Sequence, residues 1–134
     1  MNSIVDNIQK RILVAEDEDS LREMFVIIFE DEGYLVDAAE NGEQAWELIN
    51  KNHYDLLVTD LYMPKMNGFE LILQVQESFP ALKIILVSGG GREVSAEHGK
   101  GAVTFNSKEI SIDMFFKKPG NLDELVSVAE ELLE

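Results

Sequence analysis

The sequence contains no cysteine, which excludes disulfide bonds, thiolate zinc sites and cysteine nucleophiles. It is also poor in positive charge: 11 lysine and arginine residues stand against 26 aspartate and glutamate residues, a formal net charge of −15. Nucleic acids and anionic membranes are bound through basic surfaces, so we expect neither as a partner. Positively charged partners, metal cations included, are favoured instead.

Long apolar runs are absent as well. No stretch reaches the roughly 18 consecutive apolar residues that a membrane-spanning helix needs, and residues 1–10 lack the apolar core of a signal peptide. We therefore expect a cytoplasmic protein. At 134 residues the chain is long enough for one domain that buries about two thirds of its unfolded surface.

Short apolar runs alternate with amphipathic segments along the chain. The runs that predict strands are Ile12–Ala15, Tyr34–Ala39, Leu56–Thr59, Ile84–Val87 and Phe115–Phe116. Apolar residues at helical spacing predict helices after Ser20, around Ala45–Ile49, before Pro80 and after Asn121. Strands that alternate with helices indicate one parallel sheet covered by helices on both faces.

Two local signals concern helix boundaries. Ser20 and Glu23 form an S-x-x-E pattern, which predicts a capping box at the start of the first helix. Residues 89–112 are rich in glycine and polar side chains, and they signal a helix only poorly.

Polar side chains follow four of the predicted strands. Glu16 and Asp17 end the first strand, Asp60 the third, Ser88 the fourth and Lys118 the fifth. In an open parallel sheet, ligands bind beyond the carboxyl ends of the strands, so these groups should converge on one pocket.

The acidic run Glu16–Asp19 has two interpretations. By itself it is equally typical of a solvated helix N-terminus, where the helix dipole favours negative charge. Carboxylates crowded at one sheet edge, however, raise one another's pKa unless a cation joins them, and hard oxygen ligands suit Mg²⁺. A magnesium ion and a lysine beside an aspartate nucleophile point to phosphoryl chemistry through an acyl phosphate.

Four segments together resemble the receiver domains of bacterial two-component response regulators, most nearly the single-domain chemotaxis type. They are ILVAEDEDSLRE, YDLLVTDLYMPKMNGFEL, KIILVSG and FFKKPGNLDEL. The resemblance covers residues 10–134 and leaves 1–9 as an N-terminal lead-in. It implies a doubly wound (βα)5 flavodoxin-like fold with a five-stranded parallel sheet of order 2-1-3-4-5. The fourth-helix region is atypical, because the segment between Ser88 and Lys118 is long and lacks the usual alanine-rich helix.

The resemblance also implies a role for each residue of the acidic edge. Asp60 becomes the phosphoacceptor. Mg²⁺ is held by Asp60, by Asp17, by Glu16 directly or through water, and by the backbone carbonyl of Tyr62. Glu16 replaces the aspartate that is more usual in this family, and its longer arm alters the metal geometry in a way we expect to be tolerated.

The remaining family positions fall near the ends of the last two strands. Ser88 and Lys118 would stabilise the phosphoryl group, and Ser88 and Phe115 would form the switch. Phe115 lacks a tyrosine hydroxyl, so the switch would act by packing. The family's cis peptide would join Lys118 to Pro119. Lys117 is expected to point away, because neighbouring side chains on a strand face opposite sides.

The expected function is a phosphorelay receiver that accepts a phosphoryl group from a histidine kinase or a histidine phosphotransfer protein and then alters a surface bound by a downstream protein. It would not be an enzyme beyond self-catalysed phosphoryl acceptance and slow autodephosphorylation. One alternative is a Mg²⁺-dependent phosphatase with an aspartate nucleophile, although Tyr62 stands where such enzymes carry a second aspartate. The other is a pseudo-receiver that binds partners without phosphate.

Overall fold

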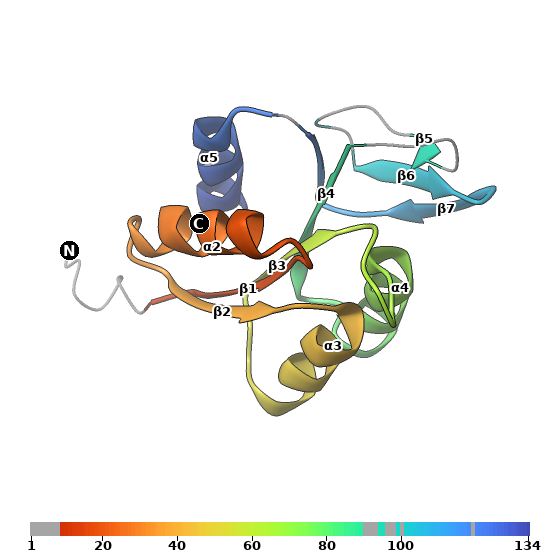
Figure 1. Cartoon of the computed structure of the whole chain (residues 1–134), viewed down its shortest axis with the longest axis horizontal. Coiled ribbons are helices and arrows are strands. Elements are labelled where there is room, and N and C mark those ends of the chain that lie inside the picture. Colours follow the sequence, from red (N-terminus) through yellow and green to blue (C-terminus); the bar gives the residue numbers. More distant parts are fainter. Residues whose placement is uncertain (1–8, 90–93, 96–98, 100, 119) are drawn as a thin grey trace.

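A five-stranded parallel sheet forms the centre of the protein, in a computed structural model that describes residues 9–89, 94–95, 99, 101–118 and 120–134 (Figure 1). Its strands run in the order β2-β1-β3-β4-β8. Their bounds are β1 Arg11–Ala15, β2 Leu35–Ala39, β3 Leu56–Asp60, β4 Lys83–Ser88 and β8 Met114–Lys117. Because β8 is the fifth strand of this sheet, the predicted order 2-1-3-4-5 is confirmed.

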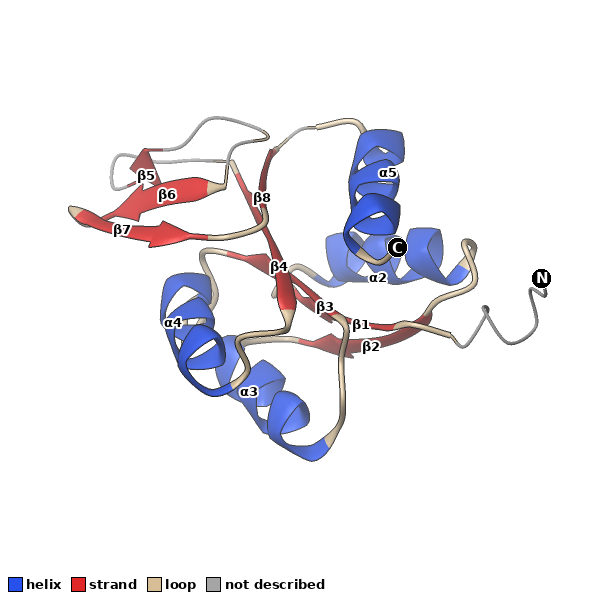
Figure 2. Cartoon of the chain, turned by 180° about the vertical axis from the view of Figure 1, so that it is seen from behind, coloured by secondary structure: helices blue, strands red, loops and turns tan. Residues whose placement is uncertain are grey.

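Helices cover both faces of this sheet, as a doubly wound fold requires. They are α2 Asp19–Glu30, α3 Gly42–Lys51, α4 Gly68–Ser78 and α5 Leu122–Leu132. Figures 1 and 2 show α2 and α5 on one face and α3 and α4 on the other. Within the described residues, no helix is long and apolar enough to cross a membrane.

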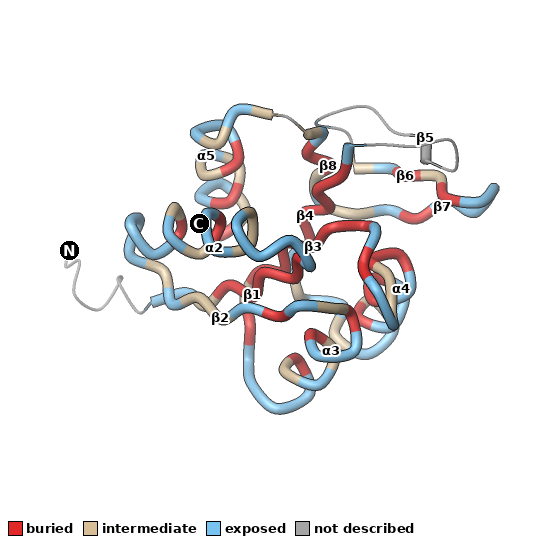
Figure 3. The backbone as a smooth tube through the Cα atoms, viewed as in Figure 1, coloured by how far each residue is buried: buried red, intermediate tan, exposed pale blue. Residues whose placement is uncertain are grey.

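The two faces of the sheet hold two separate halves of the core, because successive strand residues point to opposite sides. Ile12 and Val14 pack with the α2 and α5 side, whereas Leu13 and Ala15 pack with the α3 and α4 side. All four are at most 1% exposed. The central strands are therefore buried on both faces, and Figure 3 shows most of β1, β3 and β4 coloured as buried.

A second sheet occupies the region where the sequence signals a helix only poorly. It is antiparallel, with the order β5-β6-β7, and consists of Val94–Ser95, Ala102–Phe105 and Lys108–Ser111. No helix occurs between β4 and β8 among the residues that are described there. Val103 and Ile110 are buried in the α3 and α4 half of the core, so β6 and β7 fill space beside α4.

The capping box predicted at Ser20 and Glu23 is wrong. Helix α2 begins at Asp19 with Glu18 as its N-cap, and no side chain caps it. Ser20 therefore lies inside the first turn. A capping box occurs instead at α4, where the Asn67 side chain accepts from the Glu70 backbone N–H and the Glu70 side chain reaches back.

The strand register places the acidic residues at one edge. Ala15 of β1 lies opposite Thr59 of β3, so Glu16 and Asp60 are the next residues along two adjacent strands. Asp60 lies opposite Val87, which brings Ser88 to the same edge. The sheet thus gathers the carboxyl ends of β1, β3 and β4, as expected for a parallel arrangement.

If the antiparallel sheet is an integral part of the core, shortening Val103 should be costly. We expect Val103→Ala to lower the free energy of unfolding by about 2 kcal/mol, from lost apolar burial and the cavity left behind. The matched control is Glu109→Ala on the neighbouring strand, where the exposed side chain should change stability by less than about 0.5 kcal/mol. Urea denaturation of both variants checks this, and equal small effects would contradict it.

Candidate functional site

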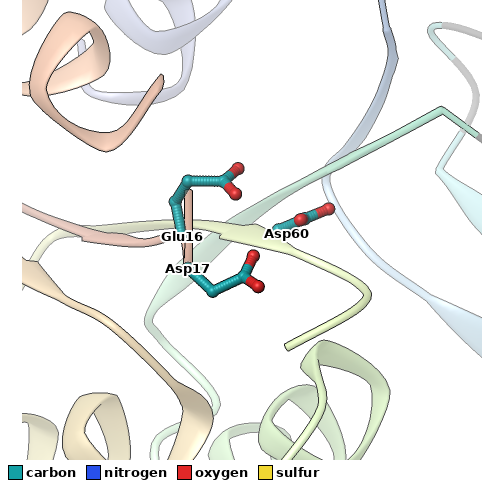
Figure 4. A group of neighbouring side chains, drawn as sticks. All are labelled: Glu16, Asp17 and Asp60. Carbon is teal, nitrogen blue, oxygen red and sulfur yellow. The ribbon is translucent and has the colours of Figure 1, made fainter. Parts of the chain in front are cut away.

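Three carboxylates meet at the carboxyl edge of the parallel sheet. One oxygen from each of Glu16, Asp17 and Asp60 lies within 4.8 Å of the others (Figure 4). Glu16 is 1% exposed and Asp60 is 8% exposed, whereas Asp17 is open to solvent. The structure therefore brings together the three side chains that the sequence singled out as a metal-binding edge.

Lys118 supplies positive charge to this cluster. Its Nζ lies 3.3 Å from Glu16 Oε1 and 3.6 Å from Asp60 Oδ2. Its backbone N–H donates to the Ser88 carbonyl at 3.0 Å, which fixes the chain at the end of β8 against the end of β4. One ammonium group thus faces two buried carboxylates.

Backbone groups fix the two buried carboxylates further. The Glu18 N–H donates to Glu16 Oε2 at 3.2 Å, and the Leu61 N–H donates to Asp60 Oδ1 at 2.8 Å. The Arg22 guanidinium donates to the Glu16 backbone carbonyl at 3.0 Å. The two backbone N–H bonds hold the carboxylates in place although the two negative charges repel each other, and the Arg22 bond holds the Glu16 backbone.

Burial and repulsion shift the protonation of the cluster. Burial, followed by the negative charge of Asp60, raises the pKa of Glu16 to about 7. Burial also raises the pKa of Asp60, although the nearby Lys118 ammonium opposes this shift. Glu16 is therefore partly protonated near neutral pH when no cation is bound.

The loop after Asp60 is held by close backbone contacts. The Gly68 N–H donates to the Leu61 carbonyl at 2.8 Å, and the Gly42 N–H donates to the Met66 carbonyl at 3.0 Å. A Cβ on Gly68 would lie 2.1 Å from the Asp60 carbonyl oxygen, so only glycine fits there. Helix α4 can therefore begin directly against the end of β3.

The remaining predicted residues lie near this edge. Ser88 is fully buried at the end of β4, and Phe115 is 1% exposed in the core. Lys117 is exposed, whereas the Lys118 side chain turns toward the carboxylates. Pro119 lies outside the described residues, so the predicted cis peptide stays a prediction.

The donor set fits a hard divalent cation. Six carboxylate oxygens from three residues are available, two of the residues are buried, and no sulfur or imidazole ligand takes part in this group. Magnesium binds such oxygen ligands through one or two carboxylates while it keeps several waters. The exposed Asp17 leaves the cluster open on its solvent side.

Sequence reasoning missed an aromatic contact beside the site. The ring of Tyr62 packs edge-on against the ring of Phe105 from β6, with 6.2 Å between ring centroids. The sequence of residues 89–112 did not predict the antiparallel sheet that places Phe105 beside Tyr62. Only AVTF and ISI, the short apolar stretches of that region, coincide with the buried positions of β6 and β7.

An α/β domain with a parallel 2-1-3-4-5 sheet and an acidic cluster at its carboxyl edge is the architecture of a signalling receiver. The sequence profile of the response regulator receiver domain matches residues 12–130. The chain belongs to this family, the receiver domains of two-component systems. Such domains are generally signalling modules and not true enzymes.

Curated relatives are similar over most of the chain. The response regulator receiver protein CpdR of Brucella abortus is 41% identical over 80 residues, which are 60% of this chain and 67% of CpdR. Response regulator GtcR of Aneurinibacillus migulanus is 33% identical over 118 residues, 88% of this chain. The chain spans 45% of the length of GtcR, and it spans 12% of the sensor kinase CckA of B. abortus.

Solved structures share the fold. The response regulator TrrA of Thermotoga maritima, in complex with Mg²⁺-BeF, has a TM-score of 0.77 and 32% identity over 93% of this chain and all (100%) of TrrA. TrrA in complex with the histidine kinase ThkA has a TM-score of 0.76 over 94% of this chain. Receiver domains thus interact with histidine kinases, as in that complex.

The raised pKa of Glu16 predicts a pH dependence of stability in metal-free protein. The stabilising effect of protonated Glu16 is complete below pH 4.5, the ordinary pKa, and is lost as pH rises through about 7. Between pH 5 and pH 8 we expect the wild type to lose about 2 to 3 kcal/mol more of its free energy of unfolding than Glu16→Gln. Urea denaturation in EDTA measures this difference. Parallel pH profiles of the two proteins would contradict it.

Proposed function

We propose that this protein accepts a phosphoryl group on Asp60 in a Mg²⁺-dependent reaction with a histidine kinase or a histidine phosphotransfer protein. The observation that carries the proposal is the group of three carboxylates within 4.8 Å, with the Lys118 ammonium 3.6 Å from Asp60. A buried aspartate beside a cation site and a lysine is the arrangement that phosphoryl transfer to a carboxylate needs.

Asp60 is the nucleophile in this scheme. Its Oδ1 accepts from the Leu61 N–H, and this bond orients the carboxylate, while Oδ2 faces Lys118. A carboxylate oxygen forms the new bond to phosphorus as the phosphorus–nitrogen bond to the donor histidine breaks, and the electron pair leaves with the imidazole. The product is an acyl phosphate on Asp60, and the donor histidine regains its neutral ring after protonation.

Glu16, Asp17, Asp60 and the Tyr62 carbonyl would hold the cation. When bound, Mg²⁺ supplies positive charge that offsets the repulsion between carboxylates and transferring phosphoryl oxygens. Lys118 faces the same carboxylates and would pair with the phosphoryl group. Lys117, its neighbour, is exposed on β8, and we assign the pairing to Lys118 alone.

Ser88 and Phe115 would convert phosphorylation into a change of surface. Ser88 is buried at the end of β4, one residue beyond the partner of Asp60, so its hydroxyl can bond to a phosphoryl oxygen. On β8, Phe115 lies opposite Leu86 of β4, and Leu86 is two residues before Ser88. A shift at Ser88 would therefore reach the packing around Phe115, and a two-state equilibrium biased in this way would alter the surface for a downstream protein.

The extent of the functional unit is part of the proposal. We assign residues 10–134 to the receiver domain and residues 1–9 to a lead-in. This agrees with β1 beginning at Arg11 and with a family match over residues 12–130. A cytoplasmic location follows from the proposed role, because the phosphodonors of such domains are cytoplasmic.

Intact mass spectrometry after incubation with Mg²⁺ and acetyl phosphate or phosphoramidate tests the proposal. We expect one phosphoryl adduct that forms only with Mg²⁺, because the bare carboxylates repel the anionic donor. Asp60→Asn should form no adduct, since an amide oxygen is a poor nucleophile.

A second donor separates donor preference from failure of the chemistry. The same measurement should be repeated with a phosphorylated histidine phosphotransfer protein. If neither kind of donor modifies the wild type, the proposed function is wrong and a pseudo-receiver role replaces it. An adduct that persists in Asp60→Asn would place the phosphoacceptor elsewhere.

A further inference from the structure

Phe105 packs on two aromatic rings, one near the start of the loop after Asp60 and one just beyond the end of that loop. Its ring centroid lies 6.2 Å from that of Tyr62, with an interplanar angle of 66°. It lies 5.2 Å from that of Phe69, with an angle of 36°. Tyr62 is two residues after Asp60, and Phe69 lies in the first turn of α4. The same ring therefore bridges the start of the loop and the residue just beyond its end.

The strand that carries Phe105 is itself firmly supported. Phe105 pairs with Lys108 across a two-residue turn, in which Asn106 and Ser107 have positive φ angles of 50° and 66°. This is the geometry of the tight turns that match the twist of a hairpin. Within this hairpin Phe105 is 9% exposed.

The hairpin is also docked on the body of the protein. Val103 is fully buried and Ile110 is 7% exposed, both in the core beside α4. The Gln76 side chain of α4 donates to the Ser111 carbonyl, and Figures 1 and 2 show the antiparallel sheet beside α4 and β8. Phe105 is thus carried by a hairpin that is anchored in the core.

Tyr62 stands near the start of this loop. Backbone hydrogen bonds hold the Leu61 and Met66 carbonyls, and the Tyr62 side chain, which is 41% exposed, packs against Phe105. Lys65 has a positive φ of 69°, which is uncommon for a residue with a side chain. Because the Tyr62 ring is attached to the backbone that carries the Tyr62 carbonyl, packing of Phe105 on this ring restrains the position of that carbonyl.

We propose that Phe105 is a positioning residue for the cation site: by packing on Tyr62 and Phe69, it fixes the loop so that the Tyr62 carbonyl faces the metal. The inference rests on the proposed function and adds to it a role for the antiparallel sheet. Because coupling between two sites is reciprocal, a cation bound at Asp60 also stabilises the docked position of β6 and β7.

Calorimetric titration with Mg²⁺ tests this directly, because it measures affinity without any phosphorylation. We expect Phe105→Leu to weaken Mg²⁺ binding by about tenfold, the lower end of the range for groups that orient metal ligands. Phe105→Tyr retains the ring and should restore wild-type affinity. Leu125→Ala, in the core on the opposite face of the sheet, should lower stability but leave Mg²⁺ affinity unchanged.

A reciprocal variant keeps the test decisive if Phe105→Leu fails to fold. Tyr62→Leu removes the other ring of the contact and should weaken Mg²⁺ binding to a similar degree. Combining both substitutions should weaken it no further than the larger single effect, since the two act through one contact.

The outcomes separate the inference from the function on which it rests. Wild-type affinity in both Phe105→Leu and Tyr62→Leu would overturn the positioning role while leaving the proposed function intact. Equal weakening in Leu125→Ala would also overturn it, because general destabilisation would then explain the effect. A wild-type chain that binds no Mg²⁺ would overturn the proposed function itself.

Discussion

The crowding of three carboxylates at the end of the parallel sheet is the constraint on which the rest of this structure depends. Glu16, Asp17 and Asp60 have oxygens within 4.8 Å of one another, and Lys118 is the ammonium that faces the two buried ones. Burial would normally favour neutral groups, and the raised pKa of Glu16 records that tendency. The fold tolerates this arrangement because backbone N–H groups bond to each of the two buried carboxylates, and close backbone contacts hold the loop after Asp60.

The proposed chemistry makes use of the same repulsion. A cation bound among the carboxylates would relieve their repulsion and would then offset the charge of an incoming phosphoryl group. The parallel sheet contributes by ending β1, β3 and β4 at one edge, so the cluster needs no long loops to assemble. The antiparallel sheet adds support from the side, since Phe105 packs on the loop that leads away from Asp60.

The sequence was most informative where one physical rule dominated. Fully apolar runs such as Leu56–Thr59 predicted the buried strands, and the polar residues after them predicted which edge carries the site. It was least informative where distant contacts decide the structure. Ser20 carries a capping pattern, yet α2 begins at Asp19 with Glu18 as its N-cap, so Ser20 lies inside the first turn. The sequence of the short strands β6 and β7 indicates strand structure only weakly. Val103 and Ile110 of these strands are buried in the core beside α4, and a local sequence pattern cannot reveal such distant contacts.

The most direct test of the central claim is whether Mg²⁺ displaces a proton from the cluster. Calorimetric titration at pH 6.5, in two buffers that differ in ionisation enthalpy, counts the protons released on binding. We predict release of a substantial fraction of one proton by the wild type, little release at pH 9, and little at either pH by Glu16→Gln, because burial raises the pKa of Glu16 to about 7. Mg²⁺ binding with no proton release at pH 6.5, or no binding at all, would contradict the claim that these carboxylates are held together for a cation.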